Sequence, residues 1–309
     1  MKTGVLSANE GRRLLGELLG QELAEVKGGD DILVAFNLVP LGSTEKKDKK
    51  KEKTLTNHPL RDSELRGVYY NVQNKRIDIR AERKFRPVLR EYLKGQRDRL
   101  IERLQPVNTR VFRRKNLIDD SIRLDLEVRI GKEAFLPVMA TLVEQAGGDA
   151  MELVGSSFPF NMSAAVVSWI DNKADVFLNQ INETTVDRLK REFEISLEAN
   201  ETRLQLISRI EDVYGEIGRG RANTIARTEV HGLTQFGTFQ GYKQANLDIK
   251  IWVSVLDKNT RGNNPNDDAD HIAMDGEEVP INMPFSNGLM YPGENGAPAA
   301  EVINCRCVI

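Results

Sequence analysis

The feature that most constrains this fold is a helical spacing of apolar side chains through most of residues 80–245. One clear stripe consists of Val166, Ile170, Ala174, Phe177 and Ile181. The pattern stops near residue 249, where a strand-like segment, IKIWVSV, leads into long loops rich in Gly, Pro, Asn and Asp. We therefore predict an α+β fold that is mainly helical, with a small C-terminal β-sheet and long loops.

Several helix boundaries can be placed inside this region. Ser163 is positioned to cap the helix that carries the stripe. Two further helices are expected near 184–198 and 202–217, with a turn at Asn200 between them. The GRGR segment at 218–221 interrupts the pattern before one more helix begins.

That next helix combines charged residues with glycines. Arg221, Arg227 and Glu229 lie within two turns, so charge pairs among them are geometrically easy. The same helix holds Gly232, Gly237 and Gly241. Glycine is costly inside a helix, so these positions indicate either close approach of another backbone or a broken helix.

The N-terminal part of the chain has a different texture. A helix is expected over 8–26 and a short strand over 32–39. Residues 43–58 are almost wholly polar and contain six crowded lysines, which predicts a solvated linker. A nuclear-localisation or polyphosphate-binding segment is the alternative for this run.

The segment from Lys75 to Lys115 is strongly basic. It contains fifteen Lys and Arg against five acids, a net charge of 15 − 5 = +10. Its apolar residues follow helical spacing, which predicts an amphipathic helix with a basic outer face, and Pro87 must lie in the first turn or kink it. This face is either an ordinary solvated surface or a contact with nucleic-acid phosphates or an acidic partner. The candidate contact residues are Arg83, Arg86, Arg90, Arg97 and Arg103.

Cys305 and Cys307 are the only cysteines of the chain. A disulfide within C-x-C would be strained, so the pair should be reduced thiols or metal ligands. Together with His271, and with Asp270 as a further candidate, they would supply three or four donors for zinc. We favour buried thiols without a ligand and keep zinc as the alternative, with no other cofactor expected. No nucleophile elbow, HExxH or Walker sequence occurs, so we do not expect an enzyme.

The residues around the two cysteines alternate as in a strand. Both thiols should face one side, with Asn304 and Arg306 on the other. Arg306 is then free to pair with an acid, and the candidates are Glu229 and Asp257. We expect this segment to pair near Trp252 and to close the small sheet against the 221–245 helix.

A longer set of motifs now carries a family resemblance. Over about residues 160–309 the chain resembles the phage Mu F-like head morphogenesis family. The resemblance rests on the order of five motifs, RANTIARTEV, W-x4-D-x2-TR, H, DG and NCRC. The matching positions are Ala222, Ile225, Ala226, Arg227, Thr228, Glu229, Trp252, Asp257, Thr260, Arg261, His271, Asp275, Gly276, Asn304, Cys305, Arg306 and Cys307. Many family members carry C-x-x-C after the Asp, where this chain has Thr260-Arg261 and a distant His271. This departure suggests that Arg261 and His271 are structural hydrogen-bonding residues.

A second resemblance covers the N-terminal end. Residues 5–42 look like the last stretch of a tailed-phage portal protein. The chain would then divide into a portal-like segment (1–42), a charged linker (43–66) and a Mu F-like minor head domain (67–309). Within that last domain, 67–246 would be helical and 247–309 would form the strands and loops.

These resemblances imply a structural minor head protein of a tailed phage or prophage. Such a protein would be made in the host bacterial cytoplasm, join the virion at the portal vertex, and act in head morphogenesis and in DNA packaging or ejection. Its partners would be the portal, other capsid components and packaged DNA. No apolar run is long enough to span a membrane. The alternatives are a toxin or effector enzyme and a stand-alone DNA-binding adaptor built on the same domain.

Overall fold

The structure is a computed structural model that describes residues 75–105 and 121–309. The expectations for residues 1–74, namely the N-terminal helix, the strand at 32–39, the portal-like segment and the charged linker, lie outside the described residues, as do residues 106–120. The described elements are α3 (Lys75–Leu104), α6 (Leu124–Leu153), α7 (Ala164–Glu198), α8 (Arg203–Glu216), the π-helix η3 (Ile217–Arg221), α9 (Ala222–Gln244), β1 (Ile249–Ile251), β2 (Glu278–Pro280) and α10 (Ala299–Val302).

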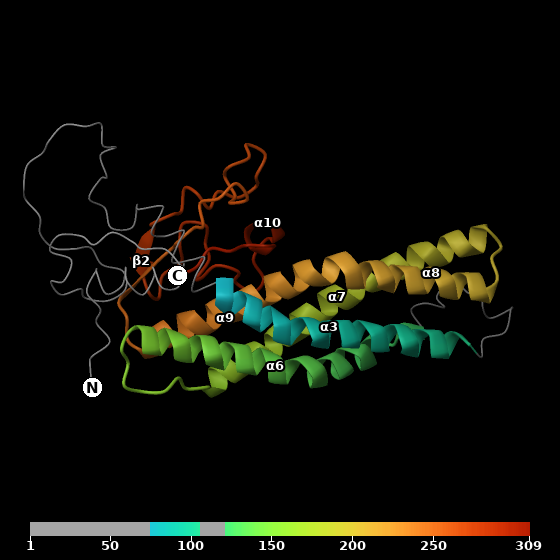
Figure 1. Cartoon of the computed structure of the whole chain (residues 1–309), viewed down its shortest axis with the longest axis horizontal. Helices are drawn as coiled ribbons and strands as arrows, with labels where there is room; N and C mark the ends of the chain where they lie inside the picture. Colours follow the sequence, from blue (N-terminus) through green and yellow to red (C-terminus); the bar gives the residue numbers. More distant parts are fainter. Residues whose placement is uncertain (1–74, 106–120) are drawn as a thin grey trace, which may run out of the picture.

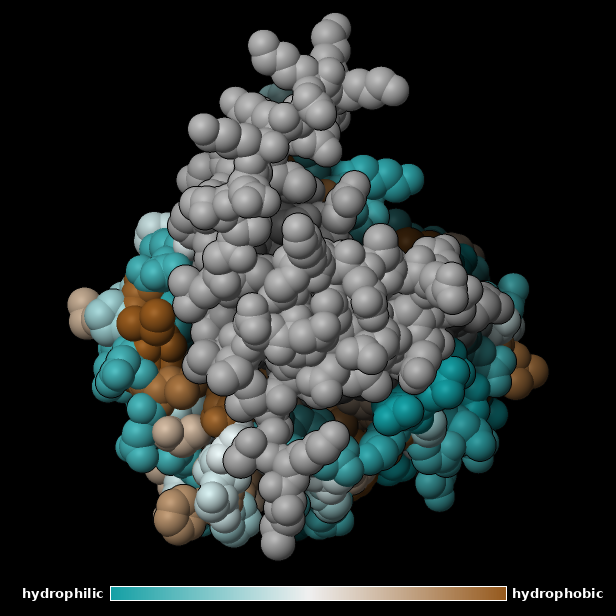
Figure 2. Space-filling view, turned by 60° about the vertical axis from the view of Figure 1, so that its left-hand side comes forward, coloured by the Kyte–Doolittle hydropathy of each residue, from teal (hydrophilic) through white to brown (hydrophobic). Residues whose placement is uncertain are grey.

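The long helices form an elongated bundle. They run lengthwise in Figure 1, with α8 at the opposite end from β2, and the C-terminal loops lie along one side. No helix of the described residues is long and apolar enough to cross a membrane. On the face shown in Figure 2, hydrophobic side chains reach the described surface in small patches between hydrophilic ones. The prediction of a mainly helical α+β fold with a small C-terminal sheet is confirmed.

Aromatic side chains from three helices meet in the core of the bundle. Phe135 of α6 lies 5.1 Å from Phe85 of α3 and 5.0 Å from Phe177 of α7 between ring centroids. All three are buried, as are the other residues of the stripe predicted along α7. Tilted and edge-on contacts of this kind add stability to the area that the rings bury. The spacing therefore identified the correct face of this helix.

Helices α6 and α9 approach each other backbone to backbone. A Cβ added at Gly237 would lie 2.5 Å from the carbonyl oxygen of Val143, and one at Gly241 would lie 2.6 Å from that of Gly147. Only glycine allows such an approach without a shift. Close approach is thus the correct reading of the glycines, and α9 is not broken.

Two boundary predictions need correction. Residues 184–198 are not a separate helix, because α7 runs unbroken to Glu198 with no Gly or Pro inside it. The GRGR segment does not break the helical path but forms most of η3, which wraps one wider turn between α8 and α9. Of the two options for Pro87, a place in the first turn is excluded, because this residue lies well inside α3. The predicted cap at Ser163 is confirmed, since its side chain accepts a hydrogen bond from the backbone N–H of Val166.

The sheet is small and ends the helical part of the chain. Strands β1 and β2 pair antiparallel, with Lys250 opposite Val279. Beyond β1, Val253 pairs with Val308 through two backbone hydrogen bonds of 2.8 and 2.9 Å. The C-terminal residues are thereby held beside the segment that follows β1, as predicted.

Candidate functional site

Trp252 is the centre of a second, smaller core in the C-terminal region. Its side chain is fully buried, and its ring meets those of His271 and Phe285 edge-on at 5.3 and 5.2 Å. The indole Nε1–H donates to Ser254 Oγ at 3.1 Å, so the polar atom of this buried ring is satisfied. Both cysteines also belong to this core.

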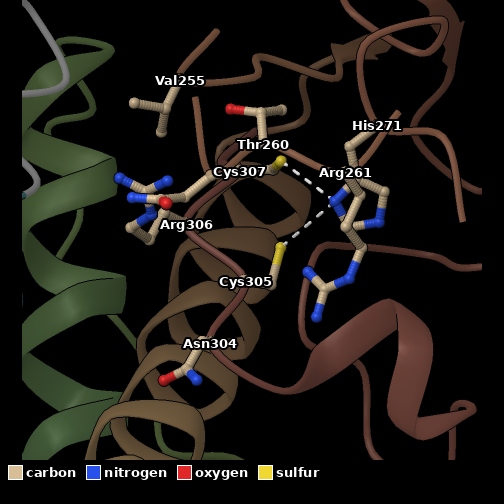
Figure 3. Close-up of a pocket in the computed structure, with 9 residues that line it drawn as sticks. Val255, Thr260, Arg261, His271, Asn304, Cys305, Arg306 and Cys307 are labelled. Carbon is tan, nitrogen blue, oxygen red and sulfur yellow. Dashed lines mark hydrogen bonds between the residues drawn. The ribbon is translucent and has the colours of Figure 1, made fainter. Parts of the chain in front are cut away.

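The two thiols and one imidazole converge on a single point (Figure 3). Nδ1 of His271 lies 3.4 Å from Cys307 Sγ and 3.7 Å from Cys305 Sγ. All three residues are buried, and their ligand atoms lie within 4.8 Å of one another. Asn304 is exposed and Arg306 points away from the imidazole. The predicted division of the side chains into two sides is confirmed, but the predicted strand is wrong. The segment is irregular, with Asn304 at a φ of 55°, and among the described residues it pairs only through the bridge at Val308.

His271 is oriented from its other side by an acid. Its Nε2 lies 2.9 Å from Glu301 Oε2, and the same oxygen accepts a hydrogen bond from Asn287 at 2.9 Å. Its backbone carbonyl accepts a 2.6 Å bond from Ser254 Oγ, which also lies 3.5 Å from Cys307 Sγ. Sequence reasoning missed Glu301 and Ser254, because neither belongs to a spacing that points toward His271.

Within this cluster the pKa values of the two thiols shift in opposite directions. The hydrogen bond from Cys305, followed by the contact with His271, holds the pKa of Cys307 well below its ordinary value. The pKa of Cys305 is raised, by its hydrogen bond to Cys307 and by burial. Burial acts to lower the pKa of His271, but its bonds to Cys307 and Glu301 outweigh this and raise it. A thiolate at Cys307 is therefore favoured in this buried place.

Asp257 and Arg306 form a two-bond ion pair at the edge of the same region. The guanidinium donates to both carboxylate oxygens, at 2.5 and 2.6 Å. This pair, with further help from the Asn259 backbone, lowers the pKa of Asp257 to about 2. Of the two acids expected for Arg306, Asp257 is correct; Glu229 instead pairs with Lys173 of α7 at 2.7 Å.

The C-terminal segment also bonds directly to α9. The Asn304 N–H donates to Thr228 Oγ1 at 3.1 Å, and the Ile309 N–H donates to Gln235 Oε1 at 3.3 Å. Arg227 points elsewhere, toward Glu82 of α3 at 3.7 Å. The expected closure against the 221–245 helix is confirmed, whereas Arg227 and Glu229 each pair with a residue of another helix.

The remaining motif residues shape the loops around Trp252. Arg261 donates to the Ile303 carbonyl, and an Asp275 oxygen accepts from the Ser254 N–H at 3.0 Å. Gly276 adopts a φ of 83° and its N–H donates to the Trp252 carbonyl at 2.8 Å. The structural role expected for Arg261 agrees with this geometry.

The five arginines proposed for contact on α3 fall into two groups. Arg83 and Arg90 are exposed. Arg86 bonds to Glu82, Arg97 bonds to the neighbouring Asp98, and Arg103 donates to the carbonyls of Ser121 and Ile122 at 2.8 and 2.9 Å. Contact of this helix with DNA or the portal stays a prediction.

A buried acid on α6 explains part of the charge of α3. Glu127 has no exposed side-chain surface, and Arg99 donates to both of its oxygens. Arg103 lies 3.7 Å from the same carboxylate. Sequence reasoning missed this pair, although Glu127 stands four and eight residues before Gly131 and Phe135 on the buried face of α6. An acid at helical spacing with core residues was the available signal.

Comparison with known proteins gives one family match. Residues 187–309 match the family described as Phage Mu protein F like protein. The match begins near the end of α7 and covers α8, η3, α9 and the whole C-terminal region. No curated protein and no solved structure matches this chain. The similarity to the Mu F family is thus supported over 187–309, and the portal-like N-terminal segment stays a prediction.

Proposed function

We propose that this protein is a minor head protein of a tailed phage or prophage, made in the host bacterial cytoplasm and built into the virion at the portal vertex. The observation that carries the proposal is the match of residues 187–309 to the Phage Mu protein F like family. The matched residues include α9 and the C-terminal segment, which is bonded to Thr228 and Gln235 of α9. The similarity therefore covers one packed unit.

We propose a structural role for this unit and no catalysis. The polar motif residues that distinguish it bond to other parts of the chain, as Arg306 does to Asp257 and Arg261 does to the Ile303 carbonyl. The cavity beside Cys305 and Cys307 has a volume of only about 10 Å³, comparable with the space that one water needs. This cavity has no space for an organic substrate beside the two cysteines.

Particle composition provides the direct test. The encoding prophage or phage would be induced, and filled heads would be purified and analysed by quantitative mass spectrometry against the portal protein. We expect this chain in the particles at a low copy number comparable with that of the portal, and cross-links between the two. Filled, infectious particles that lack the chain would overturn the proposal.

A second candidate activity is non-specific contact with packaged DNA through α3. Arg83 and Arg90 are exposed on a helix whose surrounding sequence is strongly basic, which suits phosphate contact. Replacing both with Gln should weaken binding to random duplex and reduce the dependence of log K on log salt by about two units. The matched control is Lys258→Gln, since Lys258 is exposed in the C-terminal loops. An unchanged salt slope in the Arg83 and Arg90 variant would exclude DNA contact by this face.

A further inference from the structure

The geometry points to a zinc site formed by His271 Nδ1, Cys305 Sγ and Cys307 Sγ, with a water molecule as the fourth ligand. Zinc would connect the loop after Asp270 to the C-terminal segment, inside the small core around Trp252. This inference revises our preference for thiols without a ligand and does not depend on the proposed function.

The distances between the donor atoms fit tetrahedral coordination. Zinc binds thiolate sulfur at about 2.3 Å and imidazole nitrogen at about 2.0–2.1 Å, which places the two donors about 3.5 Å apart at the tetrahedral angle. The observed separations from His271 Nδ1 are 3.4 Å to Cys307 and 3.7 Å to Cys305. Both nitrogen-to-sulfur separations therefore match those of a tetrahedral site, and the three donor atoms lie within 4.8 Å of one another.

The imidazole is already prepared to coordinate through Nδ1. Glu301 holds Nε2 at 2.9 Å, so the proton of a neutral ring is directed to Nε2 and the lone pair of Nδ1 faces the two sulfurs. Metal-bound histidines typically donate their second ring N–H to a carboxylate or carbonyl in this way. Asn287 in turn bonds to the same Glu301 oxygen and fixes its position.

Hydrogen bonding alone explains this convergence less completely. Nδ1 carries either one lone pair or one proton in the ring plane, so it forms one hydrogen bond to sulfur, whereas two sulfurs lie at hydrogen-bonding distance from it. Zinc with two thiolates and a neutral imidazole carries no net charge, since +2 − 2 = 0. A neutral cluster suits the burial of all three residues, because a charge buried without a compensating partner is costly.

The surroundings leave one coordination position for solvent. Among the described residues, the group of closely spaced His, Cys, Asp and Glu donors here consists of these three alone. The adjoining cavity of about 10 Å³ is lined in part by Thr260, Arg261 and Asn304, and it has space comparable with one water molecule. Coordination requires both sulfurs as thiolates and His271 as a neutral ring, so binding releases the protons that this cluster holds, and zinc affinity should rise with pH.

The experiment measures zinc on the full chain. Protein freed of metal is mixed with one equivalent of zinc, passed through a desalting column and analysed for metal, and a parallel sample receives cobalt(II) as a spectroscopic probe. We expect one zinc per chain, and for cobalt the visible bands of a tetrahedral site with a sulfur-to-cobalt charge-transfer band. Chelator should lower the thermal midpoint of the zinc-loaded chain. Zinc below one tenth of an equivalent, or a cobalt spectrum without thiolate bands, would overturn the inference.

Matched variants separate coordination from general damage to this region. Cys305→Ser, Cys307→Ser and His271→Ala should each lose the zinc and the response to chelator. Asp257→Asn weakens the neighbouring Arg306 contact and leaves all three ligands intact, so it should retain one zinc per chain. Glu301→Gln should bind zinc about 10–100-fold more weakly. Zinc retained by the Cys305→Ser/Cys307→Ser double variant would place the metal elsewhere and refute this site.

Discussion

The contact between α6 and α9 makes Gly237→Ala a sharp test of the packing. The new Cβ would lie 2.5 Å from the Val143 carbonyl oxygen, 2.9 Å from the Cβ of Ala146 and 3.2 Å from the Gly147 nitrogen. Two of these three atoms belong to the backbone of α6, so they cannot rotate away. The two helices must therefore separate locally for the methyl group to fit.

The expected cost follows from two opposing effects. Overpacking of a tight core costs about 1–3 kcal/mol, and a rigid backbone obstacle places this site near the upper end of that range. Alanine recovers about 1 kcal/mol of intrinsic helix preference over glycine. Gly237→Ala should therefore lower the free energy of unfolding by about 2 kcal/mol.

Gly148→Ala provides the control within the same pair of helices. Gly148 lies in α6, where an added Cβ meets nothing within 4 Å. This variant should gain about 0.5–1 kcal/mol. Urea denaturation followed by far-ultraviolet circular dichroism measures both changes in the free energy of unfolding. A Gly237→Ala protein as stable as the wild type would refute the close approach of α6 and α9.

Three further outcomes are expected. Because Arg306 lowers the pKa of Asp257 from 3.8 to about 2, the ionised carboxylate contributes stability above pH 3.8 that is lost as the pH falls toward 2. Urea melts over that window should show wild-type stability falling more steeply than that of Asp257→Asn, by at most about 1 kcal/mol because Asp257 is partly exposed. Thr202→Ala removes the capping box of α8 and should cost about 1 kcal/mol in the same assay, and no loss would contradict the cap. Glu127→Ala should cost about 2 kcal/mol or more, because it leaves arginines without their buried partner, whereas exposed Glu133→Ala should change stability by less than about 0.5 kcal/mol.

Much of the fold follows from local patterns in the sequence. Helical spacing identified the buried stripe of α7, and alternation placed both thiols on one side, because the backbone geometry of a helix or extended segment fixes which neighbours share a face. The glycines inside α9 indicated a close backbone contact, because glycine destabilises a helix interior and a close approach is a physical reason for it to be there. The similarity to the Mu F family also rests on residue order and spacing alone.

The tertiary structure decided which distant groups meet. Nothing in the spacing of α3 distinguishes Arg99, which is held by buried Glu127, from exposed Arg90, because that difference depends on where α6 crosses it. Glu301 likewise reaches His271 only through the short helix α10, thirty residues away along the chain. The period of a helix or strand fixes which nearby residues share a face, so the sequence alone reveals it. Pairs such as these depend instead on helix crossings and loop paths that bring remote segments together. The sequence therefore determined the faces of the elements, and the folded chain determined the partners of the charged groups and of His271.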